Sequence, residues 1–169
     1  MENSSLPPVH KWNPEFCGDI DMRIRRDGSW DYMGTPITRE RMVKLFSTIL
    51  RRDDDEYFLV TPVEKVGIRV DDAPFVAVEL SFEKENGDDY IYFRTNLDDY
   101  VRLDEEHPIK IIENPETGEP SPYIRVRDDL DALLSRSAFY ELADHAIEQN
   151  GSYAVKSGNK YFKIGKIEE

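Results

Sequence analysis

The chain has 169 residues, enough for one medium domain or two small, mutually dependent ones. It carries 22 Lys or Arg against 35 Asp or Glu, and this net charge of −13 argues against polymeric nucleic acid and anionic membranes as partners. No apolar run approaches bilayer length, and the single cysteine, Cys17, excludes an internal disulfide, so we expect a cytoplasmic protein.

The first predicted elements are an arm and a hairpin. Residues 1–14 contain three prolines and predict an extended N-terminal arm. Apolar and charged residues alternate over 19–24, which is typical of a half-buried strand. The dipeptide at 27–28 is Asp-Gly, a strong tight-turn signal, and the aromatic residues at 30 and 32 predict a returning strand.

An amphipathic helix is predicted next, over 39–50, with Thr38 as its N-cap. Apolar residues at i, i+3, i+4, i+7 and i+8 form its predicted buried stripe: Met42, Leu45, Phe46, Ile49 and Leu50. Two apolar strands at 57–60 and 66–70 follow, joined by a bend at Thr61-Pro62.

The second half predicts further strands, with a hairpin turn at Asn86-Gly87 and a proline-rich loop over 114–122. The predicted strands are 73–82, 90–93, 100–103, 109–112, 123–127, 152–155 and 161–164. A helical face is predicted to start at Leu130 and to end near Gln149, where Asn150-Gly151 stops the helix.

One unit occurs twice in this order: an Arg-bearing strand, a helix and a hairpin. We therefore predict an α+β fold of two interlocked units, 15–75 and 76–169, with antiparallel sheets. A seam between similar units is a common place for a ligand site.

The arginines of the two copies leave two readings open. Arg125 and Arg127 are matched with Arg23 and Arg25, and alternation puts both members of each pair on one face of a strand. If these faces look into the seam, four guanidiniums surround it; if they look outward, they pair with surface acids.

Three segments carry candidate site residues. Thr61, Glu64 and Lys65 offer a hydroxyl, an acceptor and a cation at a strand end. Asp72 and Phe75 flank a rigid proline after the next strand. The alternative for each segment is a turn whose polar groups face water.

The third segment is Arg94, Thr95 and Asn96, which follows an aromatic strand. Arg can bind phosphate and Asn can pair with a base edge. Here too the alternative is a turn, with Asn96 in a left-handed conformation.

Enzyme signatures are missing. The nine glycines never space as a phosphate loop, no Gly-x-Ser-x-Gly elbow exists, and the three histidines are scattered, so we expect no enzyme activity, metal or cofactor. A hydrolase that uses Glu64, Asp71 and Asp72 with a metal is the least favoured alternative.

A second alternative is a protein-interaction adaptor. Residues 20–52 carry eight Arg or Lys and four Asp or Glu, a charge of +4 against −17 for the rest. The helix face formed by Arg39, Arg41, Lys44 and Arg51 could dock an acidic partner with a salt-dependent affinity. A solvated helix face is the simpler interpretation.

Taken together, these segments resemble a bacterial family of unknown function, domain-of-unknown-function family 1285. The matching stretches are 18–24, 27–30, 34–39, 45–47, 59–65, 72–75, 95–96 and 123–127. The resemblance implies duplicated motifs, a C-terminal part loosely similar to pleckstrin-homology folds, and a ligand site at the interface of the two parts. It also implies a nucleotide-like ligand and a role in signalling.

We therefore expect a non-enzymatic sensor of a small anionic or nucleotide-like molecule held in the seam. In this hypothesis Lys65 and the arginines meet phosphate, Phe75 stacks on the ligand and Asn96 reads an edge. The predicted lining is Thr61, Glu64, Lys65, Asp72, Phe75, Arg94, Thr95, Asn96, Arg125 and Arg127.

Overall fold

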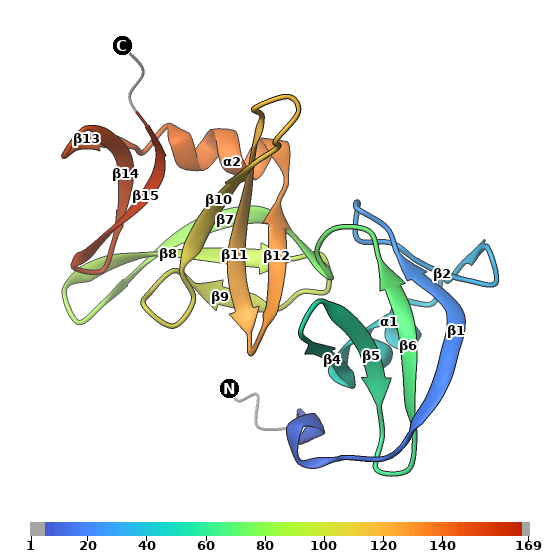
Figure 1. Cartoon of the computed structure of the whole chain (residues 1–169). Helices are drawn as coiled ribbons and strands as arrows, with labels where there is room; N and C mark the ends of the chain where they lie inside the picture. Colours follow the sequence, from blue (N-terminus) through green and yellow to red (C-terminus); the bar gives the residue numbers. More distant parts are fainter. Residues whose placement is uncertain (1–5, 167–169) are drawn as a thin grey trace. The chain divides into compact units, whose positions relative to one another are not determined.

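The computed structural model describes residues 6–166 and divides the chain into two compact units, an N-terminal unit through Pro74 and a C-terminal unit from Phe75 (Figure 1). Residues 1–5 of the predicted arm and the last three residues of the predicted C-terminal unit lie outside the described residues.

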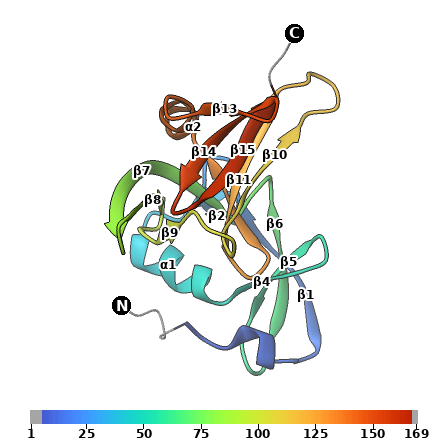
Figure 2. The same cartoon turned by 90° about the vertical axis from the view of Figure 1, so that its left-hand side faces the viewer.

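The N-terminal unit is one six-stranded sheet with a helix, α1, on one face (Figure 2). The strand order is β3-β2-β1-β6-β5-β4. The elements are a 3-10 helix at Val9–Lys11, β1 (Phe16–Ile24), β2 (Trp30–Tyr32), β3 (Thr35–Pro36), α1 (Glu40–Thr48), β4 (Leu50–Asp53), β5 (Glu56–Val60) and β6 (Lys65–Val70).

The C-terminal unit has a six-stranded sheet and a separate three-stranded one. The orders are β10-β11-β12-β7-β8-β9 and β13-β14-β15, and α2 packs against β7. The elements are β7 (Phe75–Glu85), β8 (Asp88–Thr95), β9 (Tyr100–Arg102), β10 (Ile109–Glu113), β11 (Pro120–Arg127), β12 (Leu130–Leu134), α2 (Arg136–Ala143), β13 (Ile147–Gln149), β14 (Ser152–Ser157) and β15 (Lys160–Lys166).

The predicted duplication is confirmed. Each copy is a hairpin, a helix and three antiparallel strands: β1-β2, α1 and β4-β5-β6 in the first, β11-β12, α2 and β13-β14-β15 in the second. The same ion pair marks each hairpin, Arg25 to Asp31 and Arg125 to Asp131, both at 2.6 Å. Arg25 thus stands in the place of Arg125, so the predicted match of Arg23 with Arg125 is shifted by two residues.

The prediction of purely antiparallel sheets is wrong for one strand pair in each large sheet. β1 pairs parallel with β6, and β12 pairs parallel with β7. A parallel pair needs only one long crossover connection, and the segments between these strands are long enough to supply it. The α+β class is confirmed, with mixed sheets.

The second predicted helix begins too early. Leu130–Leu134 is a strand, and α2 starts only after Ser135, whose hydroxyl oxygen accepts from the Ala138 amide at 3.1 Å. All five β12 residues are buried, so both faces of this central strand are covered. A strand buried on both faces shows no alternation, so its sequence looks like that of a buried helix.

The first helix is confirmed, but its buried face and its cap differ from the prediction. Val43 and Ser47 face the core, whereas Leu45 is 63% exposed. Ser47 can be buried because its hydroxyl donates to the Lys44 carbonyl at 2.6 Å. The N-cap is Arg39 rather than Thr38, and it makes no side-chain capping bond.

Candidate functional site

An open groove of about 670 Å³ lies over β1, β5 and β6 of the N-terminal unit. Small-ligand sites commonly have volumes of about 300–1,000 Å³. Its lining includes Phe16, Asp19, Phe58, Lys65, Gly67 and Arg69.

The floor of the groove is Gly67. Lys65, Gly67 and Arg69 alternate along β6 and so point to one face of the sheet. Gly67 lies opposite Phe58 on one side and Asp19 on the other. A Cβ at position 67 would collide with Asp19 Oδ1, so the carboxylate of Asp19 occupies the space that a side chain would take.

Two phenylalanines form the apolar part of the groove. The rings of Phe16 and Phe58 meet edge to face, with centroids 5.8 Å apart and planes at 85°. Phe58 is buried and Lys65 Nζ lies 4.3 Å from its ring centroid, whereas Phe16 is 55% exposed. Phe16 therefore offers a ring to a ligand, while the ring of Phe58 is already covered.

The two cations of the groove, Lys65 and Arg69, form ion pairs, whereas the carboxylate of Asp19 does not. Lys65 Nζ lies 2.9 Å from Asp53 Oδ2, and Arg69 Nη2 lies 2.8 Å from Asp21 Oδ1. Asp19, by contrast, has no hydrogen bond or ion pair from its side chain within residues 6–166. Burial raises the pKa of Asp53, but Arg51 and Lys65 outweigh this effect and hold it below its usual value.

Of the predicted residues in this unit, only Lys65 lines the groove. Thr61 Oγ1 accepts from the amides of Val63 and Glu64 at 3.3 and 3.1 Å, so it closes the β5–β6 turn. Asp72 Oδ2 lies 2.9 Å from Arg26 Nη1. The hydroxyl of Thr61 and the carboxylate of Asp72 are thus engaged in the unit's own structure.

In the C-terminal unit, the predicted segment 94–96 forms the turn after β8. Arg94 binds Glu79 and Asp98 at 2.8 and 2.9 Å, and their hydrogen bonds raise its pKa. Thr95 is fully buried and its hydroxyl oxygen accepts from the Leu97 and Asp99 amides at 3.2 Å. Asn96 Oδ1 accepts from the Val76 amide at 3.0 Å, which ties the turn to β7.

The same turn gathers two more predicted residues. Phe75 is fully buried, and the guanidinium of Arg127 lies 5.2 Å from its ring centroid. Arg127 also lies 3.8 Å from Asp99, and burial lowers its pKa. A ligand could stack on Phe75 only if Arg127 moved. Arg125 lies apart from this group in its ion pair with Asp131, which is buried.

Residues assigned to the two alternative functions, the hydrolase and the adaptor, also bind groups of their own unit. Asp71 Oδ2 lies 2.6 Å from Arg23 Nη2, and the hydrogen bonds of Arg23 lower the pKa of Asp71. Arg51, assigned to the basic helix face, lies on β4 and is 7% exposed, so that assignment is wrong. Arg39 and Arg41 remain exposed at the start of α1.

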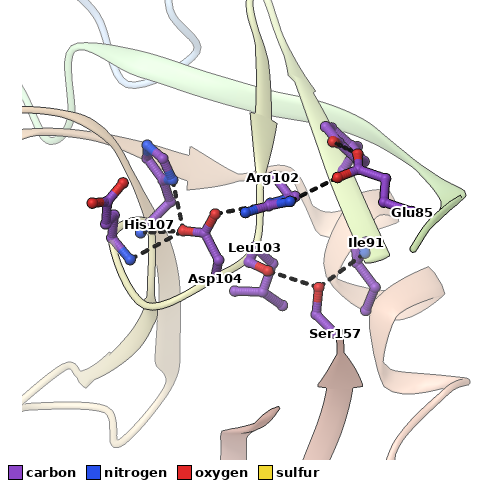
Figure 3. Close-up of polar contacts among 9 residues, drawn as sticks. Glu85, Ile91, Arg102, Leu103, Asp104, His107 and Ser157 are labelled. Atoms are coloured by element: carbon purple, nitrogen blue, oxygen red, sulfur yellow. Dashed lines mark hydrogen bonds and ion pairs between the residues drawn. The ribbon is translucent and has the colours of Figure 1, made fainter. Parts of the chain in front are cut away.

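A second polar cluster joins β7, β8 and β9 of the C-terminal unit (Figure 3). Arg102 binds Glu85 at 2.7 Å and Asp104 at 3.0 Å, and Asp104 also lies 2.8 Å from His107 Nδ1. Ser157 lies beside these ion pairs. Its hydroxyl donates to the Leu103 carbonyl at 2.7 Å and accepts from the Ile91 amide at 3.0 Å. These groups are mutually satisfied, so the cluster fixes the sheets rather than offering a reactive site.

Asp104 should make stability depend on pH. Burial raises its pKa, but hydrogen bonds from Arg102 and His107 prevail and lower it overall. A carboxyl with a lowered folded pKa stabilises above its unfolded pKa of about 3.9 and loses that effect as the pH falls. We expect Asp104→Asn to cost about 1 kcal/mol at neutral pH.

Urea unfolding of Asp104→Asn and the wild type at neutral pH and near pH 3 measures this difference, with the exposed Asp88→Asn as control. The difference in the free energy of unfolding between variant and wild type should shrink in acid for Asp104→Asn and stay near zero at both pH values for Asp88→Asn. A gap of equal size at both pH values would contradict the assignment.

The groove residues other than Lys65 were not predicted from the sequence. The usable signal was Gly67 inside an apolar strand, because such a glycine often marks the close approach of another group. The partner of that approach, Asp19, lies 48 residues away and becomes visible only through the parallel register of β1 and β6.

Neither a cluster of metal-ligating side chains nor a membrane-spanning helix occurs within residues 6–166. No three His, Cys, Asp or Glu side chains gather so that they could hold a metal ion. No helix in this part of the chain has the length and apolar character needed to cross a membrane.

These features define the class: an α+β protein of two units built on a duplicated motif, with mixed sheets. Residues 7–73 match the N-terminal domain and residues 74–164 the C-terminal domain of DUF1285, described as a domain and a protein of unknown function. The chain belongs to the DUF1285 family.

Two solved structures of this family are similar to the chain. The DUF1285 protein from Silicibacter pomeroyi DSS-3 is 48% identical, with a TM-score of 0.90 over 98% of this chain and 91% of that one. The DUF1285 protein from Shewanella baltica OS155 is 29% identical, with a TM-score of 0.58 over 73% of this chain and 90% of that one. No curated protein matches the chain.

Proposed function

We propose that the protein is a non-enzymatic sensor that binds a small, nucleotide-like molecule in the groove of the N-terminal unit. One observation carries the proposal: the Asp19 carboxylate lies over Gly67, in the space that a side chain there would take, and has no partner among residues 6–166. A carboxylate only accepts hydrogen bonds, so it suits the N–H groups of a base that carries an amino group.

The rest of the groove can bind the other parts of such a ligand. The exposed ring of Phe16 can stack on a base, which is worth about 1–3 kcal/mol per base. Arg69 and Lys65 can approach a phosphate from β6. The pair of Arg69 with Asp21 is solvent-exposed, and such pairs contribute only about 0–1 kcal/mol, so a phosphate can compete for Arg69.

The experiment is calorimetric titration of 5′-monophosphates and their nucleosides into the wild type, Gly67→Ala and Gly165→Ala. Gly165 is the matched control, because it also lies in a strand and an added Cβ there meets no atom within 4 Å. An added Cβ at position 67 would collide with Asp19 Oδ1, so Ala there displaces the Asp19 carboxylate from its place in the groove.

We expect Gly67→Ala to lose at least about tenfold in affinity while Gly165→Ala stays at the wild-type value, because one misplaced group in a small site costs about 1.4 kcal/mol or more. Lys65→Ala should weaken the monophosphates more than the nucleosides. Equal binding by all variants, or none by the wild type, would contradict the proposal.

Other parts of the proposal follow from the resemblance and the composition. They are a role in signalling, a cytoplasmic location supported by the single exposed Cys17, and a pleckstrin-homology-like C-terminal part. The adaptor alternative keeps Arg39, Arg41 and Lys44 on α1, where Met42 and Leu45 add exposed apolar surface. An affinity of α1 for acidic proteins that disappears in high salt would favour it.

A further inference from the structure

We propose that the outer face of the β13-β14-β15 sheet is a docking surface for a short acidic segment of a partner protein. We call this surface the lysine face; it consists of Lys156, Tyr161, Lys163 and Lys166, with Ile147 at its edge. It belongs to the C-terminal unit and shares no residue with the groove of the N-terminal unit.

Strand register places the lysine face on one side of the sheet. Lys156 lies opposite Tyr161, Lys163 opposite Ala154, and Lys166 opposite Ser152. Directly paired residues share a face, and alternate residues along a strand do so too. All three lysines are exposed.

The other side of the same sheet is fixed against the unit's core. Val155 and Ser157 are buried, and Ser157 holds β14 to Ile91 of β8 and to Leu103, the residue that follows β9, through its two hydrogen bonds (Figure 3). The lysine face is therefore presented by a sheet whose orientation within its unit is set by packing and hydrogen bonds.

The lysines of this face differ from most other cations of the unit. Within residues 6–166, neither Lys156 nor Lys163 nor Lys166 has an ion pair. The strands β14 and β15 and their turn contain four lysines and no Asp or Glu; the fourth, Lys160, pairs with Glu105. Ion pairs with carboxylates engage the cations elsewhere in the unit at Lys84, Arg94, Arg102, Lys110, Arg125 and Arg127.

The duplication supplies an internal comparison. In the first copy, the same three strands carry their own acids: Asp53 binds both Arg51 and Lys65, and Asp55 binds Arg52. The turn that holds Asp54 at φ 57° in the first copy holds Asn150 at φ 53° in the second. In β13-β14-β15 the only acid is Glu148, which lies opposite Tyr153 and therefore on the other face of the sheet from Lys156, so the positive charge of the lysine face is left for a partner.

The surroundings of the lysine face decide the size of that partner. The hairpin carries +4 and the remainder of the chain −17. A strand of seven residues spans about 23 Å, and at physiological salt charges are screened beyond about 8 Å. A nucleic acid or a membrane extends past the face onto acidic surface and is repelled, whereas a short acidic segment is not.

The exposed apolar atoms add a second requirement. Tyr161 and Ile147 are 43% and 48% exposed on this face, and Lys156 Nζ lies 5.7 Å from the Tyr161 ring centroid. Aromatic residues with adjacent cations are typical of binding surfaces that take an apolar side chain together with a carboxylate. We therefore infer an acidic segment with at least one large apolar residue.

The test is fluorescence anisotropy of a labelled octapeptide of six glutamates and two phenylalanines with the full-length protein at low salt. The double variant Lys156→Glu/Lys163→Glu, called the face variant, reverses the charge at two positions of the lysine face. Lys84→Glu/Arg136→Glu makes the same change in net charge at two exposed positions of the same unit. The probe bound to isotope-labelled protein also reports, by amide shifts, which strands it contacts.

We expect the face variant to bind at least about tenfold more weakly and the control within about twofold of the wild type, with shifted amides in β13, β14 and β15. Equal losses in both variants, or shifts centred on α1, would overturn the proposal. Tighter binding of a single-stranded oligonucleotide or of anionic vesicles to the same face would also overturn it. Salt-dependent dimers abolished by the face variant, without peptide binding, would assign the face to a second copy and reject a partner protein.

Discussion

Replacing Arg51 by Met is expected to lower the free energy of unfolding by about 3 kcal/mol, because it removes one partner from a buried, hydrogen-bonded ion pair. The guanidinium donates to the Val9 and Trp12 carbonyls, both at 2.8 Å, and to Asp53 at 3.0 Å. It is thus the group that ties the N-terminal 3-10 helix to β4. Met fills similar volume but leaves both carbonyls and part of the carboxylate unsatisfied.

Urea unfolding measures the loss, and tryptic cleavage after Lys11 reports release of the 3-10 helix. Arg52→Met is the matched control on the same strand, because Arg52 pairs with the fully exposed Asp55 and should cost less than about 1 kcal/mol. Arg51→Met with wild-type stability and wild-type cleavage would show that the contact is dispensable.

The second large effect is expected at Gly158, in the turn between β14 and β15. Its φ is +65°, and an added Cβ would lie 2.5 Å from Tyr90 Cε1. Its amide also donates to the Asp89 carbonyl at 2.8 Å, so the turn cannot move away without losing that bond. We expect Gly158→Ala to cost about 2–4 kcal/mol from strain and clash together.

A double-mutant cycle separates the two causes. Tyr90→Ala in the Gly158→Ala background removes the clash but keeps the strained φ, which alone is worth about 1–2 kcal/mol. Gly165→Ala, where the added Cβ is in open space, should change thermal stability little. A Gly158→Ala protein that melts with the wild type would show that the turn relaxes freely.

Hairpins were the part of the fold that local sequence could predict. Asn86-Gly87 joins β7 to β8 with φ values of 53° and 88°, as such turns require. The duplication was visible for the same reason, because each copy repeats turn residues and apolar alternation. The sequence predicted helix α1 but not which of its faces is buried. Ser47 faces the core because its hydroxyl donates to the Lys44 carbonyl, while Leu45 faces solvent.

Long-range pairing was the part that local sequence could not predict. The strand Leu130–Leu134 had the pattern of a helix because it is buried on both faces and so lacks the alternation of a half-buried strand. The groove depends on a parallel register that brings Asp19 over Gly67, and no local pattern encodes that register. The predicted site residues were chosen by chemical type, and most of them bind groups of their own unit, whereas Lys65 also lines the groove.

Nucleotide binding in the groove is tested most directly by an amide chemical-shift titration of isotope-labelled protein with guanosine 5′-monophosphate, whose base offers two adjacent N–H donors to Asp19. We predict saturable shifts at residues 16–20, 56–58 and 65–69, around the groove, and their loss in Gly67→Ala but not in Gly165→Ala. Absence of shifts at millimolar nucleotide, or shifts confined to other surfaces, would contradict the proposal that this groove binds a nucleotide-like ligand.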